Sequence, residues 1–180
     1  MSALEAIRAK LPDAARDTKL NLQSVLEGDS SLTRAQRLGI AIAAAANARC
    51  VPLREAFIEQ ARAELEHADA VIDDAYAAAT LMAMNNVYYR FRHMIGKETY
   101  SQRSPKLRMN RIGQPKTSKA DFELMSLAVS AMNGCEACVK SHEVAVLAGG
   151  LGEDHVHDAV RIAATIQAAT VALEITAGAV

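Results

Sequence analysis

The residues best suited to chemistry lie in one segment, 130–143, with the sequence Ser-Ala-Met-Asn-Gly-Cys-Glu-Ala-Cys-Val-Lys-Ser-His-Glu. Cys135 and Cys138 are three positions apart, and His142 follows four positions after the second cysteine. Gly134 interrupts a run of helix formers, so we expect both sulfurs in the first turn of a new helix, where free N–H groups favour thiolate over thiol. Cys138 and His142 would then share one helix face, and Cys135 would lie close enough to Cys138 for a disulfide.

Three interpretations of this cluster compete. A zinc site would use the two cysteines, His142 and Glu123 as ligands, but no second pair of Cys or His stands at zinc-finger spacing. In the second interpretation the cysteines are two inert core thiols beside a surface histidine. This would require no function, but Cys-x-x-Cys followed by a histidine four residues later seldom arises by chance. We therefore favour a redox-active dithiol with an aligned base.

The composition points to an all-α fold. Hydrophobic residues make up 51% of the 180 residues but aromatic residues only 4%, so Ala, Leu, Ile, Val and Met must build the core. Such a core favours closely packed helices over sheets, and the length is sufficient for one domain. The net charge of −1 gives no electrostatic footprint for nucleic acid or for an anionic membrane, so neither is expected as a partner.

The chain reads as a cytoplasmic protein. The first residues show no basic start followed by an apolar stretch, as a secretory signal would. The longest wholly apolar run, Leu38 to Ala46, is about half of a membrane span. In a reducing compartment, closely spaced cysteines indicate redox chemistry or metal binding more than a structural bridge. Cys50 stands alone in an Ala-rich segment and is expected to be an inert core residue.

Apolar periodicity and capping residues predict a succession of helices. Thr33 with Gln36 forms a capping box, and Ser118 with Asp121 caps the helix that leads into the cysteine segment. The predicted helices are about Ala3 to Lys10, Asp13 to Leu26, one capped by Thr33 that includes Leu38 to Asn47, one opened by Pro52, Asp69 to Asn85, Val87 to Ile95 as a further helix or turn, one capped by Ser118, Cys135 to Ala148, and Glu153 to Thr176.

A basic segment divides the chain. Residues 96–118 hold six basic residues and one acid, Glu98, and are interpreted as a hinge, as a docking surface for an acidic protein, or as a solvated loop. We predict one domain with an N-terminal half (about 1–95), this linker and a C-terminal catalytic half (about 119–180). Residues 83–86 (Ala-Met-Asn-Asn) and 131–134 (Ala-Met-Asn-Gly), 48 positions apart, are each expected to end an Ala-rich helix, which suggests two related halves.

Glu123 is the one acid inside the helix that precedes the cysteines. The helix has apolar residues on most sides, so this carboxylate is expected to be buried. A buried carboxylate is costly unless another group holds it, and we therefore predict a partner for Glu123.

These residues resemble a known family. Glu123, segment 133–143, the Lys-Leu-Asn-Leu segment at 19–22 and the Met-Asn-Asn-Val-Tyr-Tyr-Arg segment at 84–90 are similar to those of the AhpD-type alkylhydroperoxidases of the carboxymuconolactone decarboxylase-like superfamily. The likeness extends through nearly the whole chain. It implies an all-α fold of two related helical halves and a homotrimer.

The resemblance also implies a mechanism. Cys138 would be the peroxidatic thiol that becomes a sulfenic acid, and Cys135 the resolving thiol and proton donor, joined to Cys138 in a disulfide. His142 and Glu123 would complete a proton relay. Family members can carry a histidine between the cysteines, where this chain has Ala137. No cofactor would be bound. Electrons would come from dihydrolipoyl groups on a lipoylated carrier protein, and the dithiol would regenerate an oxidised AhpC-type peroxiredoxin through a mixed disulfide from Cys135.

Two functions from other classes remain as alternatives. One is a zinc-stabilised interaction module in which the dithiol only binds metal. The other is a cofactor-free decarboxylase of the wider superfamily, a chemistry that has no use for a resolving cysteine.

Overall fold

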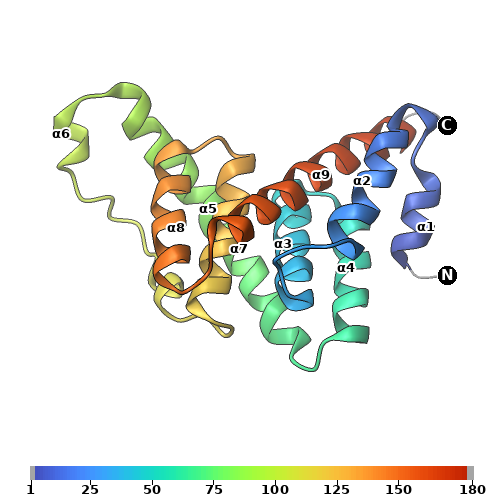
Figure 1. The fold of residues 1–180 in the computed structure, drawn as a ribbon. Helices are drawn as coiled ribbons and strands as arrows, with labels where there is room; N and C mark the ends of the chain where they lie inside the picture. Colours follow the sequence, from blue (N-terminus) through green and yellow to red (C-terminus); the bar gives the residue numbers. More distant parts are fainter. Residues whose placement is uncertain (1–2, 178–180) are drawn as a thin grey trace.

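This computed structural model describes residues 3–177, which contain nine α-helices and two short 3-10 helices joined by turns and loops, and no strand (Figure 1). The predicted all-α fold is thus confirmed. The α-helices are α1 (Ala3–Lys10), α2 (Arg16–Glu27), α3 (Arg34–Asn47), α4 (Val51–Glu64), α5 (Ala68–Ile95), α6 (Glu98–Ser101), α7 (Lys119–Met132), α8 (Glu136–Ala148) and α9 (Glu153–Ala177).

The predicted caps begin two central helices. The Thr33 hydroxyl accepts a hydrogen bond from the Gln36 N–H, and the Gln36 side chain accepts one from the Thr33 N–H, which completes the capping box of α3. The Ser118 hydroxyl accepts from the Asp121 N–H at the start of α7. Both helices are buried along most of their length, so these two elements form the centre of the core.

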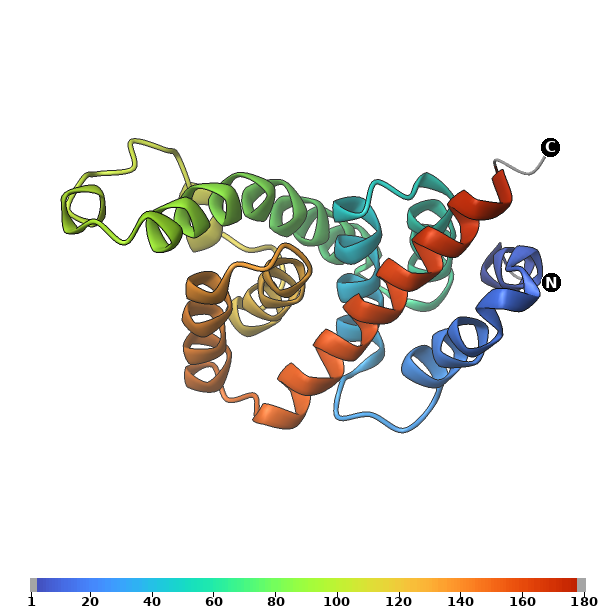
Figure 2. The same cartoon turned by 90° about the horizontal axis from the view of Figure 1, so that it is seen from above.

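Helix α5 is longer than the sequence suggested. The separate helix or turn expected at Val87 to Ile95 is wrong, because α5 runs without interruption from Ala68 to Ile95. Those residues include no glycine or proline, and the helix ends only where Gly96 adopts a left-handed φ of 62°. The far end of α5 projects beyond the other helices and carries α6 (Figure 2).

Two sets of three helices repeat along the chain. Helices α3, α4 and α5 start at Arg34, Val51 and Ala68, and α7, α8 and α9 each start 85 positions later, at 119, 136 and 153. The prediction that residues 83–86 end a helix is wrong, because these residues lie inside α5. The repeat suggested by the two segments 48 positions apart is therefore wrong as well. The constant register relates α3–α5 to α7–α9 and leaves α1 and α2 outside the repeated unit. The division into halves of about 1–95 and 119–180 stays a prediction.

Helix α9 is the one helix in residues 3–177 that is long and apolar enough to cross a membrane by length and composition. In the fold it packs against α2, α3 and α7 instead. Its residues Ile162, Ile166 and Ala169 are fully buried among those helices. One side of α9 therefore lies in the helical core.

The basic segment between α5 and α7 is anchored and not merely solvated. The fully buried carboxylate of Asp74 accepts hydrogen bonds from the N–H groups of Lys116 and Thr117, at 3.0 and 2.7 Å, and Arg111 contacts both Asp73 and Asp74 at 2.6 and 2.5 Å. Burial alone would raise the pKa of Asp74, but these hydrogen bonds outweigh it and lower the pKa. The segment is thereby held against α5, close to the cysteine helix.

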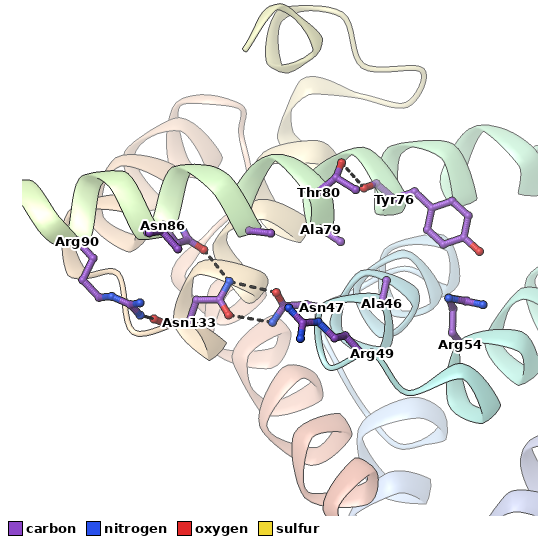
Figure 3. Close-up of a pocket in the computed structure, with 12 residues that line it drawn as sticks. Ala46, Asn47, Arg49, Arg54, Tyr76, Ala79, Thr80, Asn86, Arg90 and Asn133 are labelled. Atoms are coloured by element: carbon purple, nitrogen blue, oxygen red, sulfur yellow. Dashed lines mark hydrogen bonds between the residues drawn. The ribbon is translucent and has the colours of Figure 1, made fainter. Parts of the chain in front are cut away.

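A network of amide side chains joins α3, α5 and the end of α7 (Figure 3). Asn133 exchanges two hydrogen bonds with Asn47, both 3.1 Å long, and donates a third to Asn86 at 2.9 Å. Asn86 in turn donates to the Ser130 hydroxyl at 2.9 Å, and Arg90 donates to the Asn133 carbonyl. Because these bonds all end on Ser130 in the last turn of α7 or on Asn133, its C-cap, the network fixes the corner just before the cysteines.

Candidate active site

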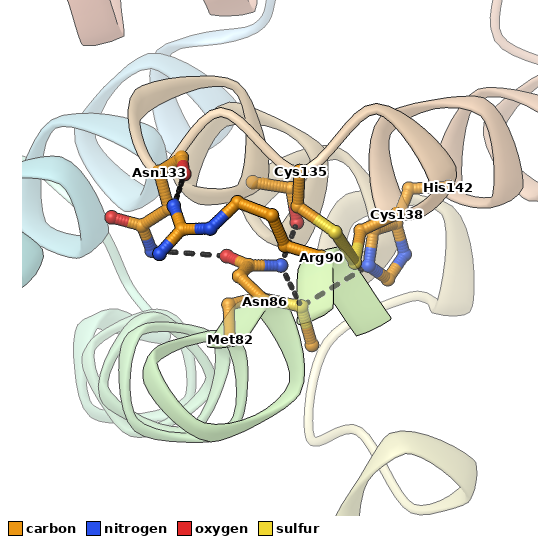
Figure 4. The surroundings of a disulfide bond; sticks show 8 residues. Met82, Asn86, Arg90, Asn133, Cys135, Cys138 and His142 are labelled. Atoms are coloured by element: carbon orange, nitrogen blue, oxygen red, sulfur yellow. Dashed lines mark hydrogen bonds between the residues drawn. A yellow bond between two sulfur atoms is a disulfide. The ribbon is translucent and has the colours of Figure 1, made fainter. Parts of the chain in front are cut away.

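The cysteine pair lies at the corner between α7 and α8 (Figure 4). Gly134 has a φ of 65°, a conformation that glycine adopts readily, and it turns the chain between the two helices. Cys135 is the N-cap of α8 and Cys138 lies in its first turn. The two sulfurs form a disulfide, with 5.3 Å between the Cα atoms, and both residues are buried.

Glu123 has the partners that its burial requires. One carboxylate oxygen lies 2.5 Å from Nδ1 of His142, and the other lies 2.5 Å from Nζ of Lys119. Burial alone would raise the pKa of Glu123, but the hydrogen bonds from His142 and Lys119, together with their charges, outweigh it and lower the pKa. Glu123 is therefore a carboxylate at neutral pH.

The contact with Glu123 determines which nitrogen of His142 is available for proton transfer. Because a carboxylate only accepts hydrogen bonds, Nδ1 carries a hydrogen and Nε2 is left to take up a proton. Nε2 lies 3.1 Å from Sδ of Met82, a weak acceptor that can receive a hydrogen bond from this nitrogen only when it carries a hydrogen. Glu123 thus orients the imidazole and is placed to stabilise a positive charge on it.

A cavity of about 390 Å³ opens beside these groups. Cys138, His142 and Glu123 line it, whereas the fully buried Cys135 lies behind Cys138 at the other end of the disulfide. The structure therefore brings the four predicted site residues together. The remaining lining residues are mostly apolar or aromatic, namely Asn85, Tyr89, Met109, Ile112, Ala137, Ser141 and Ala145.

The anchored segment forms part of this cavity. Met109 and Ile112 belong to this segment and line the cavity together with Cys138 and His142 of α8. Nζ of Lys119 donates to the Ile112 carbonyl at 2.8 Å while it contacts Glu123, so one ammonium group connects the segment to the site. Sequence reasoning missed these residues, because contacts across the fold select them and no local pattern marks them.

A larger cavity, of about 570 Å³, lies along another face of α5. It is lined by Arg49, Arg54 and Arg90, together with the amides of the network in Figure 3. Among the described residues, none of the four predicted site residues lines it. The size of a cavity therefore does not identify the redox site in this fold.

The ligand geometry does not favour zinc. Within residues 3–177, no group of three or more His, Cys, Asp or Glu side chains is arranged to hold a metal ion. Glu123 is directed at His142 and Lys119. The arrangement instead joins a dithiol to a base oriented by a carboxylate.

The lowered pKa of Glu123 predicts a pH-dependent contribution to stability. A carboxyl group whose pKa falls on folding stabilises the fold at pH values above its ordinary pKa of 4.5, and that contribution is lost progressively as the pH drops below 4.5 and through the lower pKa of the folded state. We expect Glu123→Gln to lower the free energy of unfolding at neutral pH by about 1–3 kcal/mol. Urea unfolding of both proteins should show this gap shrinking in acid, and a gap that does not change with pH would contradict the assignment.

Comparison with known proteins shows similarity over nearly the whole chain. The Carboxymuconolactone decarboxylase family matches residues 102–178. The alkyl hydroperoxide reductase AhpD of Anaeromyxobacter dehalogenans is 61% identical over 175 residues, which cover 97% of this chain and 92% of the relative. Those of Azorhizobium caulinodans and Methylobacterium sp. are 46% and 44% identical over 172 and 171 residues, covering 96% and 95% of this chain and 93% and 96% of the relatives.

The predicted resemblance is confirmed by these identities, which extend over nearly the full length of both partners in each comparison. The matched region of the family includes the cysteine pair, His142 and Glu123. The chain belongs to the AhpD family of alkyl hydroperoxide reductases, within the wider carboxymuconolactone decarboxylase group.

Proposed function

We propose that this protein reduces alkyl hydroperoxides with the Cys135–Cys138 dithiol. The observation that carries the proposal is the disulfide at the start of α8, beside the His142–Glu123 pair and at the wall of a largely apolar cavity. A cavity with Met109, Ile112 and Tyr89 in its wall suits an alkyl chain better than a charged substrate.

Cys138 is the attacking thiol in this proposal, because it is the cysteine that lines the cavity with His142. His142 takes the thiol proton at Nε2, and Glu123 stabilises the resulting imidazolium. The thiolate attacks the peroxide, a sulfur–oxygen bond forms as the oxygen–oxygen bond breaks, and an alcohol leaves after protonation. Cys138 is then a sulfenic acid.

Cys135 serves as the proton donor of the relay and as the resolving thiol. Its sulfur condenses with the Cys138 sulfenic acid, so that water leaves and the observed disulfide forms. Two electrons from an external dithiol then restore the reduced pair by thiol–disulfide exchange. We propose dihydrolipoyl groups on a lipoylated carrier protein as this reductant, with no bound cofactor.

The same dithiol is proposed to reduce an oxidised AhpC-type peroxiredoxin, through a mixed disulfide from Cys135. The protein would act in the cytoplasm as a homotrimer. Exposed apolar residues along the projecting end of α5 support an interface between copies: Val87 is 60% exposed, Phe91 43% and Met94 76%.

The decarboxylase alternative is not favoured by the site. Such a reaction has no use for a second thiol bonded to the first, whereas peroxide reduction uses both sulfurs in each cycle.

An assay with cumene hydroperoxide and dihydrolipoamide tests the proposed function. We expect the wild-type protein to couple the loss of hydroperoxide to the oxidation of dihydrolipoamide in equal amounts, since each cycle transfers two electrons. Coupled consumption should disappear when the cysteines are alkylated beforehand in the reduced protein. Hydroperoxide loss no faster than without protein would exclude the proposal.

A further inference from the structure

Asn85 is a buried polar residue in the cavity wall that the mechanism above does not use. It lies on α5, is only 4% exposed, and lines the cavity together with Cys138 and His142. Its side-chain Oδ1 is buried and has no hydrogen-bond partner among the described residues, and no residue there accepts from its Nδ2. Buried polar groups are nearly always paired, so an unpaired amide at this place points to a ligand.

The neighbouring residue shows that a buried amide on α5 can be paired by the fold. Asn86 is equally buried, and it donates to Ser130 and accepts from Asn133. In the cavity, the two oxygens of Glu123 are already occupied by His142 and Lys119. Asn85 is therefore the buried polar group on the cavity wall whose hydrogen-bonding capacity remains unused by the described residues.

We propose that Asn85 binds the hydroperoxide group of the substrate and holds it for attack by Cys138. This inference rests on the proposed function. A side-chain amide offers an acceptor and two donor hydrogens on adjacent atoms. A hydroperoxide offers a donor at its terminal O–H and acceptor lone pairs on both oxygens. Oδ1 accepts from the terminal O–H, and Nδ2 donates to the oxygen that carries the alkyl group.

This placement matches the charge changes of the reaction. The Cys138 thiolate gives an electron pair to the terminal oxygen, so the S–O bond forms and the O–O bond breaks. Sulfur is oxidised to a sulfenic acid that keeps the terminal hydrogen, while the alkyl oxygen leaves with the electron pair of the broken bond and takes a proton from the His142 relay. The N–H of Asn85 faces the oxygen on which negative charge develops, so its hydrogen bond strengthens in the transition state.

The test replaces Asn85 by leucine, which has a similar volume and no polar atoms. Pre-reduced wild-type and Asn85→Leu proteins are mixed with cumene hydroperoxide, and the rate of a single oxidation is followed by residual hydroperoxide. We expect the rate to fall about tenfold or more. Reduction of the disulfide by dihydrolipoamide should stay within about twofold of wild type, because that step involves no peroxide.

The stability of the Asn85 variants against urea distinguishes a contact with the substrate from a structural role of Asn85. Because leucine removes an unpaired buried polar group, Asn85→Leu should be at least as resistant to urea as wild type. Ser126→Ala is the matched control: Ser126 is another buried side chain with an unpaired oxygen, but it does not line the cavity, so its rate should be unchanged. If Asn85→Leu does not fold, Asn85→Ala, which has a smaller side chain, replaces it in the test. We expect the same fall in the oxidation rate for this variant.

The remaining outcomes overturn the inference. An unchanged oxidation rate in both Asn85 variants would show that the amide does not bind the peroxide. Equal losses of peroxide oxidation, disulfide reduction and stability would assign Asn85 a structural role. If the reduced wild-type protein itself consumed no hydroperoxide, the proposed function would fail first and this inference with it.

Discussion

Replacement of Cys138 by serine should abolish hydroperoxide reduction, with a fall in rate of at least roughly a thousandfold. Serine keeps the size and the position in the first turn of α8, but its hydroxyl remains protonated where a thiol can ionise, and it does not support sulfenic acid chemistry. Single-turnover mixing of the pre-reduced variant with cumene hydroperoxide measures the effect.

Cys50→Ser is the matched control for that experiment. Cys50 is a free, buried cysteine at the N-cap of α4, in the same position within the first repeated unit that Cys135 occupies in the second. Leu53 and Phe57 stand at the positions that correspond to Cys138 and His142, 85 residues earlier. Cys50 therefore has neither a second thiol nor an imidazole at those positions. Its variant should retain the wild-type rate. Substantial hydroperoxide reduction by Cys138→Ser would exclude Cys138 as the attacking thiol.

Replacement of Cys135 by serine should stop the cycle after its first chemical step. Attack by Cys138 would still release one alcohol, but no second thiol could then condense with the sulfenic acid. We expect one burst of hydroperoxide loss, a steady-state rate reduced by about a hundredfold or more, and a Cys138 sulfenic acid that dimedone traps. Intact-mass measurement after dimedone treatment detects the adduct.

The opposite assignment of the two thiols gives a different result. If Cys135 were the attacking thiol, Cys135→Ser would show no burst and no adduct, whereas Cys138→Ser would show both. The two variants together therefore establish the order of the chemical steps. A Cys135→Ser protein that turned over at the wild-type rate would exclude any resolving role for that residue.

Much of the site could be predicted because its spacing is local. Gly134 marks the start of a helix that Cys135 caps and that carries Cys138 and His142, and helical periodicity alone places the last two on one face. Glu123 could be identified as an acid in an apolar helix that had to have a partner. Caps at Thr33 and Ser118 located the helices that form the core.

The rest depends on contacts between residues distant in sequence. Nothing near Ile112 in the chain indicates that Asp74 anchors its segment, because that interaction joins positions about forty residues apart. The short similarity at residues 83–86 was misleading because four matching residues are weak evidence, whereas the 85-residue repeat shows in the helix bounds and in their caps, with Cys50 and Cys135 at equivalent positions. Asn85 and Asn86 are identical in type, and only the fold shows that one is paired and the other is not.

The proposed dithiol chemistry is tested most directly by titrating the fully reduced protein with one equivalent of cumene hydroperoxide, followed by thiol counting and peptide mapping. We predict the loss of two thiols for each hydroperoxide converted to alcohol, a peptide cross-linked between Cys135 and Cys138, and Cys50 left as a free thiol. Hydroperoxide that persists beside the intact dithiol, or a disulfide that includes Cys50, would contradict it.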